Sequence, residues 1–200
     1  MNRLSALVGV IGLCSACAIL PEQVEVTYTP DPSVARPARV AAQGEVRLHV
    51  ADARHAESPV WIADKKNGYG MRLASVNAQR PVADLVRDAL TQELQARGIS
   101  VGSGRDLIQA DITRFETDYR TRFFSVGAVA TADFAIQVRR ADGVIAYARN
   151  FSVTNDEEAG LAGTAGQSRR ATENALSKIV GQIVADPAFL AALVQGGKTS

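Results

Sequence analysis

The stretch that decides the fold is FSVGAVATADFAIQV, residues 124–138, in which every even-numbered position carries an apolar side chain. The odd-numbered positions are mostly polar or small, and Thr131, Asp133 and Gln137 are among them. Side chains of a β-strand point alternately to the two faces of a sheet, so this spacing predicts one long strand with one buried face. A buried face needs a second layer to cover it, and the flanking sequence must provide that layer.

The segments on either side predict partners for this strand. Residues 106–119 alternate in the same way through Ile112, and the phase then slips to Phe115, which predicts a strand with a bulge. Downstream, Asp142-Gly143 predicts a turn into another strand. The residues expected on one side of that strand are Ile145, Tyr147, Phe151 and Val153.

The first half of the domain carries two further strand signals. Residues 44–50 alternate between polar and apolar side chains, which predicts a half-buried strand. Asn67-Gly68 then lies between two β-like runs and predicts a hairpin with a two-residue turn. Such a turn would pair Ile62 with Leu73 on one face and place Trp61 on the other.

Two segments have the apolar spacing of helices that bury one face. The first begins at Pro81, whose missing N–H is harmless at a helix start, and ends before Gly98. The second runs from about Ser168 to Ala185, and Asp186-Pro187 then begins a short third helix. The predicted stripes are Val82, Leu85, Val86, Ala89, Leu90 and Leu94 in the first helix, and Ala171, Ala175, Leu176, Ile179, Val180 and Ile183 in the second.

These elements predict an α+β fold. Hairpin-connected strands form a mostly antiparallel β-sheet, and the two main helices each have one apolar stripe to bury. We therefore expect a two-layer domain with both helices packed on one face of the sheet. The other face, which carries polar residues such as Asp133 and Gln137, should be at least partly exposed to water.

The amino terminus predicts export and a lipid anchor. Arg3 precedes an uncharged apolar run from Leu4 to Leu13, which is typical of a signal peptide and too short to span a bilayer. The small pair Ser15-Ala16 then precedes Cys17, which resembles the lipobox of bacterial lipoproteins. This resemblance implies that Cys17 is acylated and that the preceding residues are removed. The lipobox position three before the cysteine is usually Leu, whereas here it is Cys14.

Acylation of Cys17 would fix the protein to a membrane, because two or more acyl chains anchor a protein stably. The mature chain would then hold no free thiol, which suits an oxidising compartment. Ala18, rather than Asp, follows the cysteine, and this resembles the sorting pattern of Gram-negative outer-membrane lipoproteins. We expect a cell-envelope protein, lipid-anchored at the outer membrane with its domain facing the periplasm.

The sequence divides into a signal peptide (1–16), a lipidated N-terminus and flexible tether (17–43), a single periplasmic α+β domain (44–195) and a tail (196–200). The tether prediction rests on four prolines and many small or polar residues. Fully stretched, its roughly 26 residues would reach about 90 Å, so the domain could stand well away from the bilayer. Within the tether, Val24, Val26 and Tyr28 alternate with polar residues and predict a short edge strand.

Composition and motifs exclude several functions. The chain has 22 basic and 21 acidic residues, and loss of Arg3 with the signal leaves the mature chain formally neutral. A nucleic-acid-binding protein would show a strongly basic face, so we expect no nucleic acid partner. His49 and His55 are the 2 histidines, and scattered acids near them are weak evidence for a metal site. Because the sequence also lacks a Gly-x-Ser-x-Gly nucleophile turn, we expect no catalytic residue, metal or cofactor and no enzyme activity.

The predicted hairpin is a candidate contact surface. Trp61 lies on its stem, Lys65 and Lys66 precede the turn, and Tyr69 lies beside it. Aromatic and basic side chains on an exposed hairpin suit protein recognition. The alternative is that Trp61 packs under the adjacent loop.

The order of these parts resembles a known family. TQELQARGISVG (91–102) ends the first helix, and ITRFETDYR (112–120) and VGAVATADFAIQV (126–138) form strands before the closing IVADPAFLAAL (183–193). This order is similar to that of the YajG family of bacterial lipoproteins over nearly the whole chain, most specifically over residues 81–155. The resemblance implies an envelope lipoprotein without an assigned biochemical activity. The one site residue that it carries over is the acylated Cys17.

Three functions stay open at this point. The first is a non-catalytic module that binds an envelope protein or glycan through its exposed sheet face or its hairpin. The second is an envelope enzyme acting on cell wall or lipid, which requires acids or histidines to converge in a cleft. The third is a carrier of a lipid or other apolar ligand, which requires an unfilled apolar cavity between the helices and the sheet.

Overall fold

A computed structural model describes residues 20–34, 45–67, 69–121, 126–157 and 164–195. The predicted signal peptide, Cys17 and the tail lie outside these residues. The described residues form an 8-stranded sheet and three helices. The strands are β1 (Glu22–Val24), β2 (Glu45–Asp52), β3 (Trp61–Lys66), β4 (Arg72–Ala78), β5 (Ser100–Val101), β6 (Asp106–Thr121), β7 (Val126–Arg139) and β8 (Ile145–Glu157), and the helices are α1 (Val82–Ala96), α2 (Ala165–Ala185) and α3 (Pro187–Gln195).

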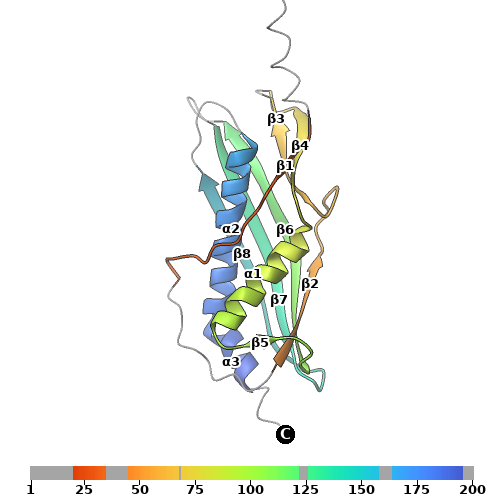
Figure 1. Ribbon diagram of the computed structural model, residues 1–200, viewed down its shortest axis with the longest axis vertical. Helices are drawn as coiled ribbons and strands as arrows, with labels where there is room; N and C mark the ends of the chain where they lie inside the picture. The colour runs from red at the N-terminus through yellow and green to blue at the C-terminus, as the bar shows by residue number, and fades with distance from the viewer. Residues whose placement is uncertain (1–19, 35–44, 68, 122–125, 158–163, 196–200) are drawn as a thin grey trace, which may run out of the picture.

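The two-layer α+β architecture is confirmed, with α1 and α2 on the same face of the sheet (Figure 1). Every residue of the two predicted helix stripes is buried, and so are the even-numbered residues of β7 from Ala128 to Val138. Phe124, at the start of the predicted alternation, lies outside the described residues. The long pairings of β7 with β6 and β8 are antiparallel, whereas β2 joins β6 in parallel. Burial of these apolar faces against each other is the main stabilising contribution to the domain.

β6 organises the sheet. β7 pairs with it along its whole length on one side. On the other side β2 pairs with its first half, up to Ile112, and β3 joins it further along at Thr117. The register of β6 and β7 shifts between Ile112 and Arg114, so the predicted bulge before Phe115 is confirmed. The bulge therefore lies between the part of β6 that pairs with β2 and the part that pairs with β3.

Helix ends follow local chemistry. Pro81 precedes α1, and Gly98 after it has a φ of 84°, a left-handed conformation that glycine adopts without strain. α2 begins earlier than predicted, because Thr164 and Gln167 form a capping box in which each side chain accepts a hydrogen bond from the other's backbone N–H. Among the described helices none is by itself long and apolar enough to cross a membrane, whereas α2 and α3 meet the length and composition requirement as a pair bent by 57°.

The hairpin is confirmed, but its predicted turn is wrong. Lys66 pairs with Arg72, so the loop spans residues 67–71 instead of two residues, and Ile62 does not pair with Leu73. The Asn67 side chain accepts hydrogen bonds from the backbone N–H groups of Tyr69 (3.0 Å) and Met71 (2.9 Å). Gly70 has a φ of 81°. An Asn side chain that closes a wider loop, with a glycine in the left-handed region, explains the difference.

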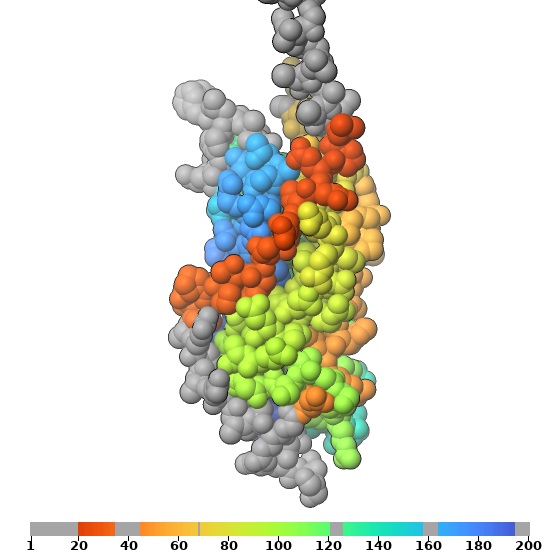
Figure 2. Space-filling model, in the orientation of Figure 1, coloured from red at the N-terminus to blue at the C-terminus, as the bar shows by residue number. Residues whose placement is uncertain are grey.

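The tether prediction is also wrong for residues 20–34, which belong to the folded domain. β1 pairs in parallel with β4, with Glu22 opposite Val76. The chain then crosses the helix face between α1 and α2 (Figure 2), and Val26 is buried there. The predicted edge strand therefore exists, but it comprises Glu22–Val24 and the rest of the alternation packs on helices. A local pattern could not show that a groove of matching shape lies on the distant helices.

Contacts with both α1 and α2 hold this segment on the helices. The Tyr28 hydroxyl donates a 2.9 Å hydrogen bond to Glu93 of α1. Further along, Val34 approaches Gly181 of α2 so closely that a Cβ at that glycine would lie 2.8 Å from the Val34 Cγ2 atom. The absence of a side chain at Gly181 thus makes room for the segment.

One residue of the last strand also departs from its predicted place. Ile145 is 51% exposed, although it was expected on the same side as Tyr147, which is buried. The register of β7 and β8 shifts between Val138 and Arg139, so Tyr147 lies opposite Val138 and Ile145 lies opposite Arg139. The irregular pairing at this strand end takes Ile145 away from the core.

Candidate functional site

A groove of about 380 Å³ lies where β2 leaves β6 and β3 begins. Phe115 is buried in the core beneath the helices, so its neighbours Arg114 and Glu116 lie on the opposite, open face of the sheet. We call this hollow the Trp61 groove. Its lining residues are Arg54, His55, Ala56, Glu57, Trp61, Thr113, Arg114, Phe115 and Glu116.

Arg54 braces the floor of the Trp61 groove. Its Nη1 atom donates hydrogen bonds to the backbone carbonyls of Trp61 (2.9 Å) and Phe115 (2.8 Å). Its Nε atom donates to Asp52 at 2.7 Å, and the arginine side chain is only 4% exposed. Arg54 thus joins the three strands that diverge at the bulge, in place of the missing backbone ladder. Sequence reasoning missed this residue, because no local pattern marks an arginine whose partners come from three strands.

The charged groups of the Trp61 groove are paired. Glu57 forms an ion pair with Arg72, and the hydrogen bond from that guanidinium holds the pKa of the Glu57 carboxyl below its usual range. Arg114 forms an ion pair with Glu116, with 2.7 Å between the Nη2 and Oε1 atoms. A general acid at neutral pH needs a raised pKa, which is the opposite of what Glu57 has. The groove therefore presents an aromatic ring among compensated charges, an arrangement that favours recognition over proton transfer.

The four predicted contact residues do not form one surface. Trp61 lines the groove, with its ring N–H donating to Asp64 at 2.9 Å, and it is half-buried beside the loop of residues 54–57. Lys65 pairs with Glu22 (2.5 Å) and Lys66 with Asp118 (2.6 Å). Tyr69 is 92% exposed in the hairpin loop, at the other end of β3 from Trp61.

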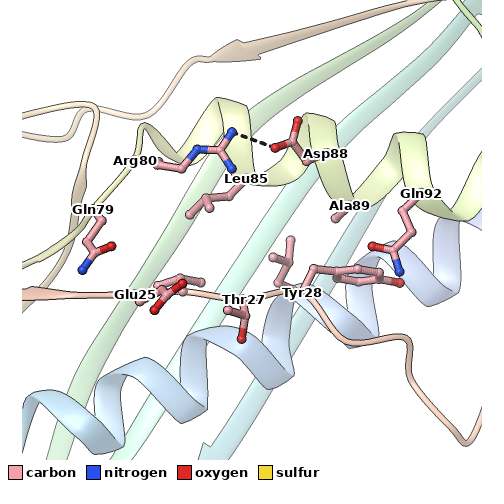
Figure 3. A pocket seen from close by; sticks show the side chains of 11 residues that line it. Glu25, Thr27, Tyr28, Gln79, Arg80, Leu85, Asp88, Ala89 and Gln92 are labelled. Atoms are coloured by element: carbon pink, nitrogen blue, oxygen red, sulfur yellow. Dashed lines mark hydrogen bonds and ion pairs between the residues drawn. The ribbon is translucent and has the colours of Figure 1, made fainter.

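A second hollow, of about 350 Å³, lies on the helix face between α1, α2 and the N-terminal segment (Figure 3). Arg80 and Asp88 form a 2.7 Å ion pair on its rim. Thr27, which lines the hollow, donates to Glu173 of α2 at 3.0 Å, so the docked N-terminal segment forms one wall of this space. The carrier hypothesis requires an unfilled apolar cavity between the helices and the sheet. The helix stripes beneath this hollow are buried against the sheet, which disfavours that hypothesis.

The two histidines are not brought together in a metal site by the part of the chain that the structure describes. His49 and His55 are both exposed, and His55 alone lines the Trp61 groove. Within the described ranges, no group of three or more His, Cys, Asp or Glu residues could hold a metal ion. Cys14 and Cys17 lie outside those ranges.

A comparison with solved structures finds this fold in another protein. Protein XCC0632 from Xanthomonas campestris aligns with a TM-score of 0.63 at 19% identity, over 90% of this chain and 99% of its own. A minor lipoprotein from Acinetobacter baumannii aligns with a TM-score of 0.42 at 10% identity, over 73% of this chain and 95% of its own. At 19% identity the likeness to XCC0632 concerns the fold alone. No curated protein matches the sequence.

Family membership follows from the sequence itself. Residues 32–194 match a family described as uncharacterized lipoprotein. The match covers both main helices and all strands from β2 to β8, which is nearly the whole folded domain. The chain belongs to this family of bacterial lipoproteins, and its expected place is the cell envelope.

Proposed function

We propose that this protein is a YajG-type lipoprotein, anchored at the outer membrane through acylated Cys17, whose periplasmic domain binds another envelope protein without catalysing a reaction. Membership of a lipoprotein family supports the anchor. The observation that carries the binding role is the Trp61 groove, in which a half-buried indole ring lies on a floor held by Arg54. The protein acts as an adaptor and needs no cofactor or metal.

The groove has the properties of a protein-binding site. Tryptophan and arginine are the side chains most enriched among residues that dominate interface energies. The hydrogen bonds of Arg54 fix the floor before a partner arrives, which lowers the entropy cost of binding.

The groove also argues against the envelope-enzyme alternative. An acid–base mechanism needs one free carboxyl with a raised pKa or a histidine oriented by a partner. Both carboxylates in the groove, Glu57 and Glu116, are instead engaged by arginines. We therefore favour binding, with a protein as the ligand and a glycan as the competing outcome of the experiment below.

Photo-crosslinking in intact cells tests the binding role. A photoreactive amino acid in place of His55, on the wall of the groove, should give an adduct that is lost when Trp61→Ala is added. The matched control places the same probe at Arg87, which is exposed on α1. A protease-sensitive adduct supports a protein partner, whereas an adduct that only a cell-wall hydrolase removes identifies a glycan. Equal labelling from both probe sites, or an adduct that survives Trp61→Ala, contradicts the proposal.

Mass spectrometry of the mature amino terminus tests the anchor separately. We expect the first residue to be Cys17 carrying a diacylglyceryl group and an acylated amine. The Cys17→Ala variant should keep its signal residues and lose this modification. A wild-type protein that starts elsewhere, or that carries an unmodified Cys17, contradicts the anchor without affecting the groove.

A further inference from the structure

The link between the lipid anchor and the folded domain is short. Leu20 is the third residue after Cys17, and residues from Glu22 onward already pair with the sheet. Three residues span at most about 11 Å when fully stretched. If Cys17 carries the acyl chains, as the proposed function requires, Leu20 is held within about that distance of the bilayer surface.

Leu20 lies beside the β3–β4 hairpin. Its backbone carbonyl accepts a 3.3 Å hydrogen bond from Lys65 of β3. β1 then runs parallel to β4, with Glu22 opposite Val76, so β1 leads away from the hairpin loop and its first residue lies at the end nearer that loop (Figure 1). The anchor therefore brings this hairpin end of the domain, and no other, to the membrane.

Exposed apolar side chains gather at the same end. Tyr69 is 92% exposed, Met71 60% and Leu73 37%, and Leu20 beside them is 58% exposed. Among the described residues, the other large exposed apolar side chains are Val144 and Ile145, which lie in and after the β7–β8 turn. Clustered exposed apolar groups mark an interaction surface.

The charges around the hairpin favour a lipid surface over an anionic ligand. Lys65 pairs with Glu22, and Lys66 pairs with Asp118. Arg72 is engaged by Glu57 and by Asp64, the latter at 3.0 Å. The cations are thus neutralised within the protein, and the apolar side chains dominate the tip. A tyrosine combines an apolar ring with a polar hydroxyl and is enriched where a membrane meets water.

We propose that the hairpin tip, formed by Tyr69, Met71 and Leu73, lies in the headgroup region of the bilayer that holds Cys17, and that it orients the domain there. The inference rests on the proposed acylation of Cys17.

In this orientation the sheet extends away from the membrane. β3 meets β6 at Thr117 and the β7–β8 turn lies beyond Leu107, so the two ends are separated by at least about 30 Å of strand. The Trp61 groove remains on the open face of the sheet, accessible from the periplasm.

The test uses the full-length, natively processed lipoprotein reconstituted into vesicles of phosphatidylethanolamine and phosphatidylglycerol. Met71→Cys is labelled with a polarity-sensitive fluorophore, and Val144→Cys, 55% exposed in the wild type, is the matched control at the opposite end. We expect a blue-shifted emission at position 71 and its quenching by lipids brominated on the acyl chains. The label at position 144 should show neither effect. Both substituted side chains are exposed, and thermal unfolding of the labelled variants checks that each is folded.

The outcomes separate the two proposals. A protein that carries acylated Cys17 but shows the same water-like emission at positions 71 and 144 overturns the membrane contact and leaves the anchor intact. A mass spectrum with unmodified Cys17 overturns both. Quenching at position 71 that disappears in Tyr69→Ser, Leu73→Ser further supports the hairpin tip as the contact.

Discussion

The two faces of the sheet differ in what covers them. On the helix face the chain covers much of its own surface: residues 20–34 cross between α1 and α2 (Figure 2), and Tyr28 donates a hydrogen bond to Glu93 of the buried Glu93–Arg97 pair. On the open face, Arg54 closes the gap between diverging strands, while Trp61 stays half-exposed above it. The comparison indicates that stability resides mainly in the covered face and that the open face is available to a partner.

The largest expected effect is on the covered face of β7. Phe134 is 1% exposed and contacts Phe115, with ring centroids 6.2 Å apart. Phe134→Ala should lower the free energy of unfolding by about 3–5 kcal/mol, because it removes buried surface and leaves a cavity. Gln137→Ala, on the open face of the same strand, should change it by less than about 0.5 kcal/mol. Urea unfolding measures both variants. Equal losses in their free energy of unfolding would contradict the conclusion that stability resides mainly in the covered face.

Arg54 tests whether the open face also contributes to stability, because its side chain is buried on that side of the sheet. Arg54→Met keeps much of the apolar stem but leaves Asp52 and the carbonyls of Trp61 and Phe115 without their donor. We expect a loss of about 2–3 kcal/mol in the free energy of unfolding, from unsatisfied polar groups. The same variant should weaken crosslinking from position 55, because the floor is no longer fixed. An Arg54→Met variant as stable as the wild type would show that the hydrogen bonds of Arg54 do not stabilise the junction of the three strands.

Two tyrosines give a smaller and more selective effect. Tyr28→Phe removes the hydrogen bond to Glu93 and should cost about 1–2 kcal/mol of stability, because the buried carboxylate loses a donor. Burial, together with that hydrogen bond, raises the pKa of the Tyr28 hydroxyl, so the bond persists throughout the neutral range. Tyr69→Phe at the exposed tip should be neutral within about 0.5 kcal/mol. Urea unfolding of the pair would contradict the docking of residues 20–34 if both variants were neutral.

The smallest effect is a pH dependence at the corner between α2 and α3. Burial acts to raise the pKa of the Asp186 carboxyl, but hydrogen bonds from Tyr147 and Arg149, each 2.7 Å long, outweigh it and hold the pKa below its usual value. A carboxyl with a lowered folded-state pKa stabilises the protein above its unfolded pKa of about 4, and this contribution is lost as the pH falls towards the folded value.

Asp186→Asn should therefore be less stable than the wild type at pH 7, by about 1 kcal/mol for weakened hydrogen bonds. The difference should shrink below about pH 4, as the wild-type carboxyl becomes protonated. Urea unfolding at pH 7, 5 and 3 measures the gap. A gap that stays constant with pH would mean that the Asp186 charge does not contribute.

Much of the fold could be predicted because its signals are local. The alternation up to Val138, the helix stripes and the bulge before Phe115 each follow from the spacing of apolar residues within one element. The candidate site was predicted only in part. Trp61 was identified, but its neighbours Arg54 and Arg114 were not, since the hydrogen bonds and pairing that place them join strands remote in sequence.

By itself the sequence determined which faces are apolar, which segments form helices, and that the chain carries a lipoprotein-like amino terminus; these depend on neighbouring residues alone. Only the tertiary structure decided that residues 20–34 pack on the helices, that the hairpin loop spans 67–71, and that Trp61 and Tyr69 lie on separate surfaces. The reason is physical: a proline-containing polar segment folds or stays free according to the groove available elsewhere, and that groove exists only after the helices have packed on the sheet.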